Sequence, residues 1–147
     1  MKGWDYQAAF SRNLGLVTAE EQERLRQTCV AIAGMGGVGG VHLVTLARLG
    51  VGAFHLADMD FFEMANFNRQ YGATLGTIER SKVDVMSEIV REINSDVKLT
   101  CFPGGSRWKI AASSSREAIS FLTASTSSRS KHAVRCFEPH VRKDSML

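Results

Sequence analysis

The sequence predicts a Rossmann-like α/β fold, in which helices pack on a doubly wound and mostly parallel sheet. Short apolar runs at residues 29–33, 54–57 and 97–102 are typical of strands buried inside such a sheet. Segments with apolar residues at helical spacing lie between them, at 38–49 and 81–93. The alternation of strand and helix indicates right-handed crossovers and the first half of a doubly wound fold.

The boundaries of these elements have local signals. Thr18-Ala19-Glu20-Glu21 has the pattern of a capping box, which predicts a helix that continues to about Gln27. Gly50 is a plausible end of the helix at 38–49, because glycine readily adopts the left-handed conformation found there. Residues 59–80 contain several Asn and Gly breakers and are expected to be mostly loop.

Composition changes near residue 105, so we expect an incomplete domain at 1–105. Residues 1–106 carry 10 Lys or Arg and 12 Asp or Glu, whereas residues 107–147 carry 8 and 3. Serine makes up 9 of the 25 residues at 106–130, where no strand-like alternation is found. The sheet is therefore expected to be truncated after about three strands. An irregular Ser/Arg-rich tail at 106–147 would follow, either disordered or the product of a shifted reading frame.

The composition also excludes several classes of protein. The chain has 147 residues, of which 44% are hydrophobic, and fits one small globular domain. It has no apolar run of about 18 residues that would span a membrane. The three cysteines are widely spaced and form no CxxC pair, so they suggest neither a zinc ribbon nor a redox pair. We therefore expect a cytoplasmic protein with reduced cysteines and no membrane partner. The net charge of +3 comes from the tail, so it gives no argument for nucleic-acid binding.

A glycine cluster lies between the first strand and the helix that follows it. Its spacing, Gly34-x-Gly36-x-x-Gly39 with Gly37 inside, fits a tight turn that opens a helix. Exposed N–H groups and the positive end of the helix dipole then favour an anion. The motif predicts a nucleotide site but does not decide which nucleotide.

Polar residues after the second strand distinguish the candidate nucleotides. Asp58 lies 19 residues after Gly39, where a dinucleotide-type fold binds ribose hydroxyls. The following loop and helix start supply groups that suit a triphosphate: Asp60, Asn66, Arg69, Gln70 and Lys82. An NAD(P)- or FAD-binding oxidoreductase domain is the alternative. It shares the glycine turn and Asp58 but leaves the rest of this polar set unexplained.

The order and spacing of these motifs over residues 6–105 resemble the ThiF/MoeB/HesA family of ubiquitin-activating-enzyme-like adenylyltransferases. The resemblance rests on the glycine turn, Asp58-x-Asp60, Asn66-x-x-Arg69-Gln70 and Lys82. It implies binding of ATP and Mg²⁺ and adenylation of the C-terminal Gly-Gly carboxylate of a ubiquitin-like or sulfur-carrier protein. Sulfur transfer, conjugation and tRNA modification stay open as its context, and this chain would be an inactive or partial version.

The resemblance also implies roles for individual residues. Arg12, Arg69 and Lys82 would be catalytic, and Arg12 matches an arginine that reaches the ATP of a partner subunit. Intact relatives would therefore be homodimers, although Asn13 departs from the family pattern beside Arg12. The magnesium-binding aspartate of the family is not found in this chain. The nucleotide would be bound by Gly34, Gly36, Gly37, Gly39, Asp58, Asp60, Asn66, Arg69, Gln70 and Lys82.

Overall fold

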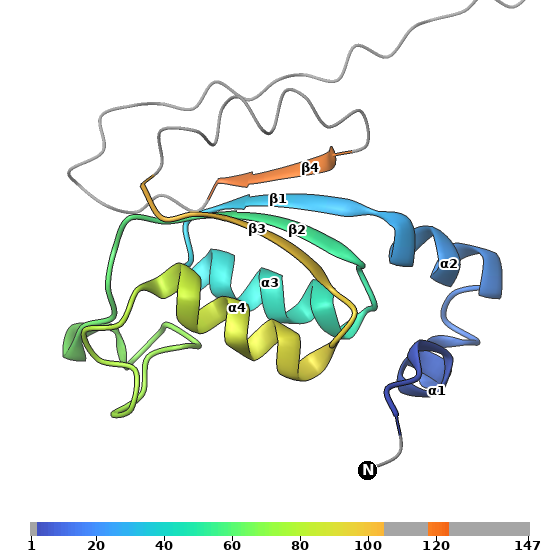
Figure 1. Cartoon of the computed structure of the whole chain (residues 1–147), viewed down its shortest axis with the longest axis horizontal. Helices are drawn as coiled ribbons and strands as arrows, with labels where there is room; N and C mark the ends of the chain where they lie inside the picture. The colour runs from blue at the N-terminus through green and yellow to red at the C-terminus, as the bar shows by residue number, and fades with distance from the viewer. Residues whose placement is uncertain (1–2, 105–117, 124–147) are drawn as a thin grey trace, which may run out of the picture.

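A computed structural model of the chain describes residues 3–104 and 118–123, and these form a parallel sheet with helices on one face (Figure 1). The sheet has four strands in the order β3-β2-β1-β4. The strands are β1 (Cys29–Ala33), β2 (Ala53–Ala57), β3 (Lys98–Phe102) and β4 (Ala118–Thr123). The helices packed on this face are α3 (Gly37–Arg48) and α4 (Lys82–Ile93). The predicted Rossmann-like α/β class is confirmed.

Shorter elements precede and interrupt this unit. They are α1 (Tyr6–Phe10), the 3₁₀ turn η1 (Ser11–Asn13), α2 (Ala19–Gln27) and a second 3₁₀ turn, η2 (Met64–Asn66). The predicted capping box is present at α2, where Thr18 Oγ1 accepts from the Glu21 N–H at 3.2 Å. The Glu21 carboxylate accepts from the Thr18 N–H at 2.8 Å. Gly50 has a φ of 92°, as its place after α3 requires.

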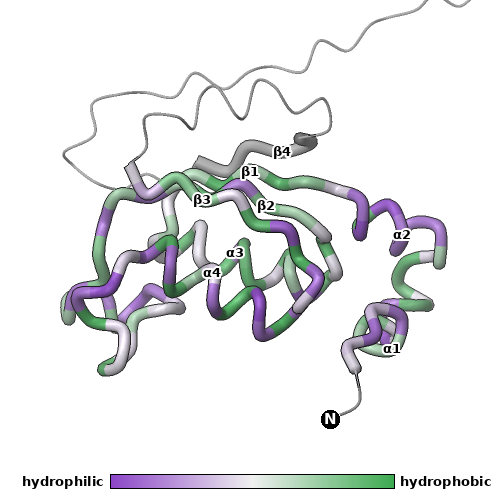
Figure 2. The backbone as a smooth tube through the Cα atoms, viewed as in Figure 1, coloured by the Kyte–Doolittle hydropathy of each residue, from purple (hydrophilic) through white to green (hydrophobic). Residues whose placement is uncertain are grey.

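The core lies between the sheet and the two helices α3 and α4. Alternate residues of a strand point to the same face, so Ile32, Phe54 and Leu56 meet Leu43 and Met86 from the helices, and all five are 0% exposed. Figure 2 shows hydrophobic residues along β1 and β2, while α2 is mostly hydrophilic. Truncating one of these large core side chains to alanine would cost about 2–5 kcal/mol, so this layer fixes the sheet on which the site is built.

The fourth strand corrects the expectation of a sheet that stops after three strands and an irregular tail. β4 pairs with β1 in parallel register, with Ala31 opposite Phe121 and Ala33 opposite Thr123. Strands of an all-parallel sheet read as apolar runs rather than alternations, and backbone hydrogen bonds from a distant strand select them. The absence of alternation was therefore the wrong criterion. Residues 105–117 and 124–147 lie outside the described part, as do the disorder and reading-frame interpretations that concern them.

The strand order identifies one edge of the sheet as a binding edge. From β1, the chain adds β2 and β3 on one side and β4 on the other, so the direction of winding reverses at β1. Ligands of open α/β sheets bind beyond the carboxyl ends of the strands at such a reversal. The turn after Ala33, at the carboxyl end of β1, occupies this position.

Candidate functional site

The glycine turn connects β1 to the start of α3. Gly34 has a φ of 92° and donates its N–H to the Ala57 carbonyl at 2.7 Å, which holds the turn against the end of β2. A Cβ on Gly39 would lie 1.7 Å from the Gly34 carbonyl oxygen, so only glycine allows the helix to start this close to the turn. Gly36 caps α3 without any side-chain hydrogen bond. The first N–H groups of α3 therefore have no side-chain cap, and Gly37 begins a helix end suited to an anion.

Asp58 joins the ends of two strands. Its Oδ2 accepts from the Met35 N–H at 2.5 Å, and its Oδ1 accepts from the Asp60 N–H at 2.8 Å. The carboxylate thus fixes the glycine turn relative to the loop after β2. Each carboxylate oxygen has a further acceptor site, so Asp58 can still accept from a ribose hydroxyl. The Met35 contact was missed from the sequence, because a backbone donor has no residue signature.

Arg69 and Gln70 lie against the glycine turn although the sequence separates them from it. A Cβ on Gly37 would lie 3.2 Å from the Arg69 carbonyl oxygen, and one on Gly36 would lie 3.8 Å from Gln70 Nε2. The guanidinium of Arg69 donates from Nη1 to the Ala65 carbonyl at 2.8 Å and to Asn68 Oδ1 at 2.9 Å. No described acidic side chain pairs with it, so its other N–H groups are available for phosphate oxygens.

Gln70 has a buried side-chain oxygen without a described hydrogen-bond partner beside the glycine turn. The residue is 8% exposed, and its Oε1 is buried without a hydrogen-bond partner in the described part of the chain. A buried acceptor without a partner costs about 1–3 kcal/mol. Such an atom beside a glycine turn is what a site completed by a ligand donor would contain.

Asn66 shapes the turn that carries Arg69 and Gln70. Its backbone carbonyl accepts from the N–H groups of both residues, at 3.2 and 2.9 Å, and its Oδ1 accepts from the Glu63 N–H at 3.0 Å. This explains the spacing Asn-x-x-Arg-Gln as the geometry of one turn. The side-chain Nδ2 of Asn66 has no partner in the ranges 3–104 and 118–123, so a donor remains for a ligand.

Lys82 begins α4 and faces the same loop. Its Nζ lies 3.2 Å from Asp60 Oδ2, and its backbone N–H donates to the Asp60 carbonyl at 3.0 Å. The side chain of Lys82 is 7% exposed and that of Asp60 is 56% exposed. The pair is half-solvated and contributes little stability. It places a cation whose other donors are unused at the carboxyl edge of the sheet.

Arg12 is not brought to this site. Its neighbour Asn13 donates from Nδ2 to the Leu49 carbonyl at 3.2 Å and to Gln22 Oε1 at 2.9 Å. Leu49 follows the last residue of α3, about 18 Å along the helix from Gly37. The departure at Asn13 therefore has a structural role, and Arg12 is exposed at the far end of α3 from the glycine turn.

The described residues do not form a complete metal-binding cage. They contain no group of three or more His, Cys, Asp or Glu side chains placed to hold a metal ion. The carboxylate of Asp58 is engaged by two backbone N–H groups, and that of Asp60 by Lys82.

Comparison with known proteins identifies the family. The ThiF family model matches residues 10–132, which is most of the chain. The chain belongs to the ThiF family. It is 40% identical over 90 residues to tRNA threonylcarbamoyladenosine dehydratase of Bacillus subtilis, a match that covers 61% of this chain and 35% of that protein. It is 41% identical over 88 residues to ubiquitin-like modifier-activating enzyme 5 of Aedes aegypti, covering 60% of this chain and 21% of that one.

Solved structures agree with this membership. The Escherichia coli tRNA N6-threonylcarbamoyladenosine dehydratase in complex with ATP matches with a TM-score of 0.75 and 28% identity. That match covers 82% of this chain and 50% of the other. This ThiF-family chain thus spans about a third, and a fifth, of the two curated relatives. Membership favours the adenylyltransferase interpretation over the oxidoreductase alternative. In the described ranges no helix is long and apolar enough to cross a membrane.

Proposed function

We propose that this chain binds ATP at the carboxyl edge of the sheet, as part of the adenylation of a carboxylate. The observation that supports this most is the position of Arg69 and Gln70 against Gly36 and Gly37. It brings the backbone and Cγ of Arg69, whose guanidinium has no described acidic partner, to the uncapped start of α3. It also leaves the buried Gln70 Oε1 as an acceptor for a hydroxyl or amino group of a ligand. The ATP complex of the E. coli dehydratase adds a relative that binds this nucleotide.

In the proposed complex the N–H groups after Gly36 bind phosphate oxygens, and Asp58 accepts from the ribose. Arg69 binds the triphosphate through its free N–H groups, and Asn66 donates from Nδ2. Lys82 supplies a second positive charge once it shares its donors between Asp60 and the nucleotide. These contacts position the α-phosphate without any covalent bond to the protein.

The proposed chemistry is a displacement at that phosphate. A carboxylate oxygen of the substrate attacks the α-phosphorus, the bond to the β-phosphate oxygen breaks, and pyrophosphate leaves with the electron pair. Negative charge grows on the departing pyrophosphate, and Arg69 and Lys82 stabilise it. The product is an acyl-adenylate of the substrate.

The proposed substrate is the C-terminal Gly-Gly carboxylate of a ubiquitin-like or sulfur-carrier protein. The names of the relatives include both a ubiquitin-like modifier-activating enzyme and a tRNA dehydratase, so a tRNA-linked context stays a second possibility. Arg12 would act on the ATP of a second copy of the chain, because its own site is a helix length away. The proposal therefore includes a homodimer.

We expect this chain alone not to catalyse carrier-dependent exchange of pyrophosphate into ATP. The described residues contain no group of three or more side chains placed to hold a metal ion, and the site of each copy lacks its own Arg12. Robust exchange by the purified protein would contradict this part of the proposal while leaving ATP binding intact.

Ligand-dependent melting tests the nucleotide assignment. ATP should raise the melting temperature, since a ligand at about 100 times its dissociation constant stabilises by about 2.7 kcal/mol. Arg69→Gln should lower the affinity for ATP, read from this shift in melting temperature, about 10-fold or more. Arg91→Gln, on the exposed side of α4, should leave the affinity unchanged. Protection by NADH and none by ATP would overturn the proposal and favour the oxidoreductase alternative.

A further inference from the structure

A cavity lies at the opposite end of the sheet from the glycine turn, beside the amino ends of β2 and β3. Its volume is about 510 Å³, and it is formed where α2 ends, where β2 and β3 begin and where α4 ends. Its lining consists of Tyr6, Glu23, Arg26, Gln27, Gly52, Ala53, Asn94, Asp96 and Lys98. Its size is in the range of small-molecule sites, and the proposed ATP site uses none of these residues.

The cavity contains hydrogen-bond donors that the protein does not use. Asn94 is 1% exposed, and its Oδ1 accepts from the Asp96 N–H at 3.1 Å. Its Nδ2 has no partner among the residues that the structure describes. Lys98 is exposed at the start of β3, and its ammonium group likewise has no described partner. A buried amide and an ammonium in one cavity suit a ligand with acceptor oxygens.

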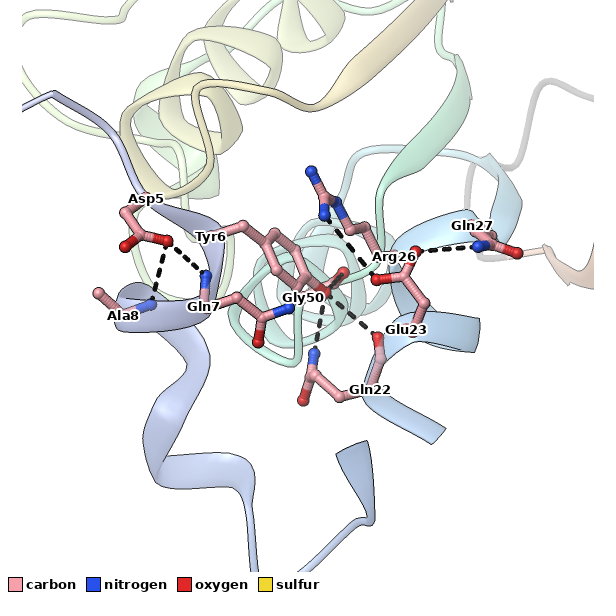
Figure 3. A network of polar contacts seen from close by, with 9 residues as sticks. All are labelled: Asp5, Tyr6, Gln7, Ala8, Gln22, Glu23, Arg26, Gln27 and Gly50. Atoms are coloured by element: carbon pink, nitrogen blue, oxygen red, sulfur yellow. Dashed lines mark hydrogen bonds and ion pairs between the residues drawn. The ribbon is translucent and has the colours of Figure 1, made fainter. Parts of the chain in front are cut away.

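In the described structure, Arg26 contacts Tyr6 and Glu23 without using its hydrogen-bond donors. Its guanidinium carbon lies 4.7 Å from the centre of the Tyr6 ring, and Nη1 lies 3.8 Å from Glu23 Oε2. Figure 3 shows this arrangement, with Glu23 also bonded to Gln27. The stacking on Tyr6 orients the planar fork at the mouth of the cavity, and its N–H groups have no close hydrogen-bond acceptor among the described residues, so they can bind a carboxylate.

The charged side chains of the cavity limit which ligands with acceptor oxygens it can bind. Arg26 and Lys98 are balanced by Glu23 and Asp96, and the carboxylate of Asp96 has no described partner. The net charge of the lining is therefore close to zero, and a dianion such as phosphate would gain no net attraction from it. A ligand with one carboxylate and one ammonium group would use the free donors and the free Asp96 together.

We propose that this cavity binds a small zwitterionic carboxylate of the amino acid or dipeptide class. The ligand carboxylate accepts from Arg26, Lys98 and the Asn94 amide, and the ligand ammonium donates to Asp96. The site is separate from the nucleotide edge and does not depend on the proposed ATP function.

Nuclear magnetic resonance of the full chain tests this site, with glycylglycine as the probe. Titration should shift the side-chain amide signals of Asn94 saturably, with a dissociation constant of about 1–10 mM for so small a ligand. Acetate, methylamine and inorganic phosphate should each bind at least about 5-fold more weakly, since each lacks half of the required pairing. No saturable shift, or tighter binding of phosphate than of glycylglycine, overturns the proposal.

Variants separate the cavity from general effects of charge. Lys98→Gln and Arg26→Gln should weaken glycylglycine about 5-fold or more, whereas Arg24→Gln, on the same helix but outside the cavity, should not. Asp96→Asn should remove the preference for glycylglycine over acetate. Because Arg26 also packs on Tyr6, the Lys98 variant is decisive if Arg26→Gln fails to fold. Equal binding by Lys98→Gln and the unaltered chain contradicts the proposal.

Discussion

Gln70 has a buried oxygen that lacks a partner in the described structure. A substitution can therefore test separately how this oxygen affects the stability of the fold and the affinity for ATP. Replacing it by the similar-sized methionine, Gln70→Met, removes the unsatisfied acceptor. We expect the free energy of unfolding to stay the same or to rise by about 1–3 kcal/mol, while affinity for ATP falls. Urea unfolding with and without ATP measures both. A loss of stability together with unchanged ATP affinity would show that Gln70 is a packing residue.

For individual residues, the sequence predicted which side chains lie at the candidate nucleotide site, but not the hydrogen bonds that position them. The spacing of Asn66, Arg69 and Gln70 placed all three in one loop, and the structure adds that a single turn organises them. The partner of Asp58 is the backbone of Met35, which no residue pattern indicates. Arg12 lies far from the glycine turn of its own chain, as expected if it acts on the nucleotide of a second copy, and that role stays a prediction.

The start of α3 depends on the absence of a side chain at Gly39. In Gly39→Ala the new Cβ would need to occupy the position of the Gly34 carbonyl oxygen, 1.7 Å away, so the helix must move off the turn. We expect a loss of about 3 kcal/mol or more, measured by urea unfolding, together with loss of ATP binding. The control Gly76→Ala has open space and should change stability by less than about 1 kcal/mol. Equal stability of the two variants would contradict the close approach.

Helix α1 is attached to the rest of the molecule through a buried tyrosine. Tyr6 donates to the Gly50 carbonyl at 2.6 Å and accepts from Gln22 Nε2 at 2.9 Å (Figure 3). Burial raises the pKa of Tyr6 above its ordinary value of 10.0, although the Gln22 hydrogen bond and Arg26 oppose the shift. The unfolded chain therefore loses this proton at a lower pH than the folded one.

It follows that the free energy of unfolding has its full contribution from Tyr6 below about pH 10 and falls as the pH rises through the folded pKa. Urea midpoints between pH 8 and 11 measure the slope. Tyr6→Phe should flatten it and cost about 1–3 kcal/mol at pH 8, because the Gln22 amide and the Gly50 carbonyl lose a buried partner. Tyr71→Phe, at an exposed tyrosine, should leave the slope unchanged. A flattened slope in the Tyr71 variant instead would be inconsistent with this assignment.

The helices and strands with local signals were predicted to within a residue or so. Residues 29–33 formed the expected strand, and α4 begins after Ser81, whose Oγ accepts from the Asp84 N–H at 3.4 Å. Helix α1 was missed because five residues carry no amphipathic period and depend on packing by Tyr6 and Phe10. Strand β4 was missed because pairing with β1 selects it, and no local pattern records that pairing.

At the scale of the whole molecule, the sheet and the helices α3 and α4 bring all the predicted nucleotide-binding residues to one end of the sheet. The predicted catalytic residue Arg12 lies elsewhere. The class of fold followed from the sequence because apolar runs and helical periods alternate along it. The strand order β3-β2-β1-β4 did not, since the fourth strand was not expected. That order places the winding reversal beside the glycine turn, where ligands of open α/β sheets bind, and so supports the proposed position of the nucleotide site.

The most direct measurement is a nuclear magnetic resonance titration of the full chain with a non-hydrolysable ATP analogue. The account predicts saturable shifts of the backbone amides of Gly36 and Gly37 and of the side-chain signals of Arg69 and Lys82. Signals of Gly52 and Lys98, at the amino ends of the strands, should stay in place. Binding that shifts only the amino edge, or no saturable binding at all, would contradict the claim that the carboxyl edge is an ATP site.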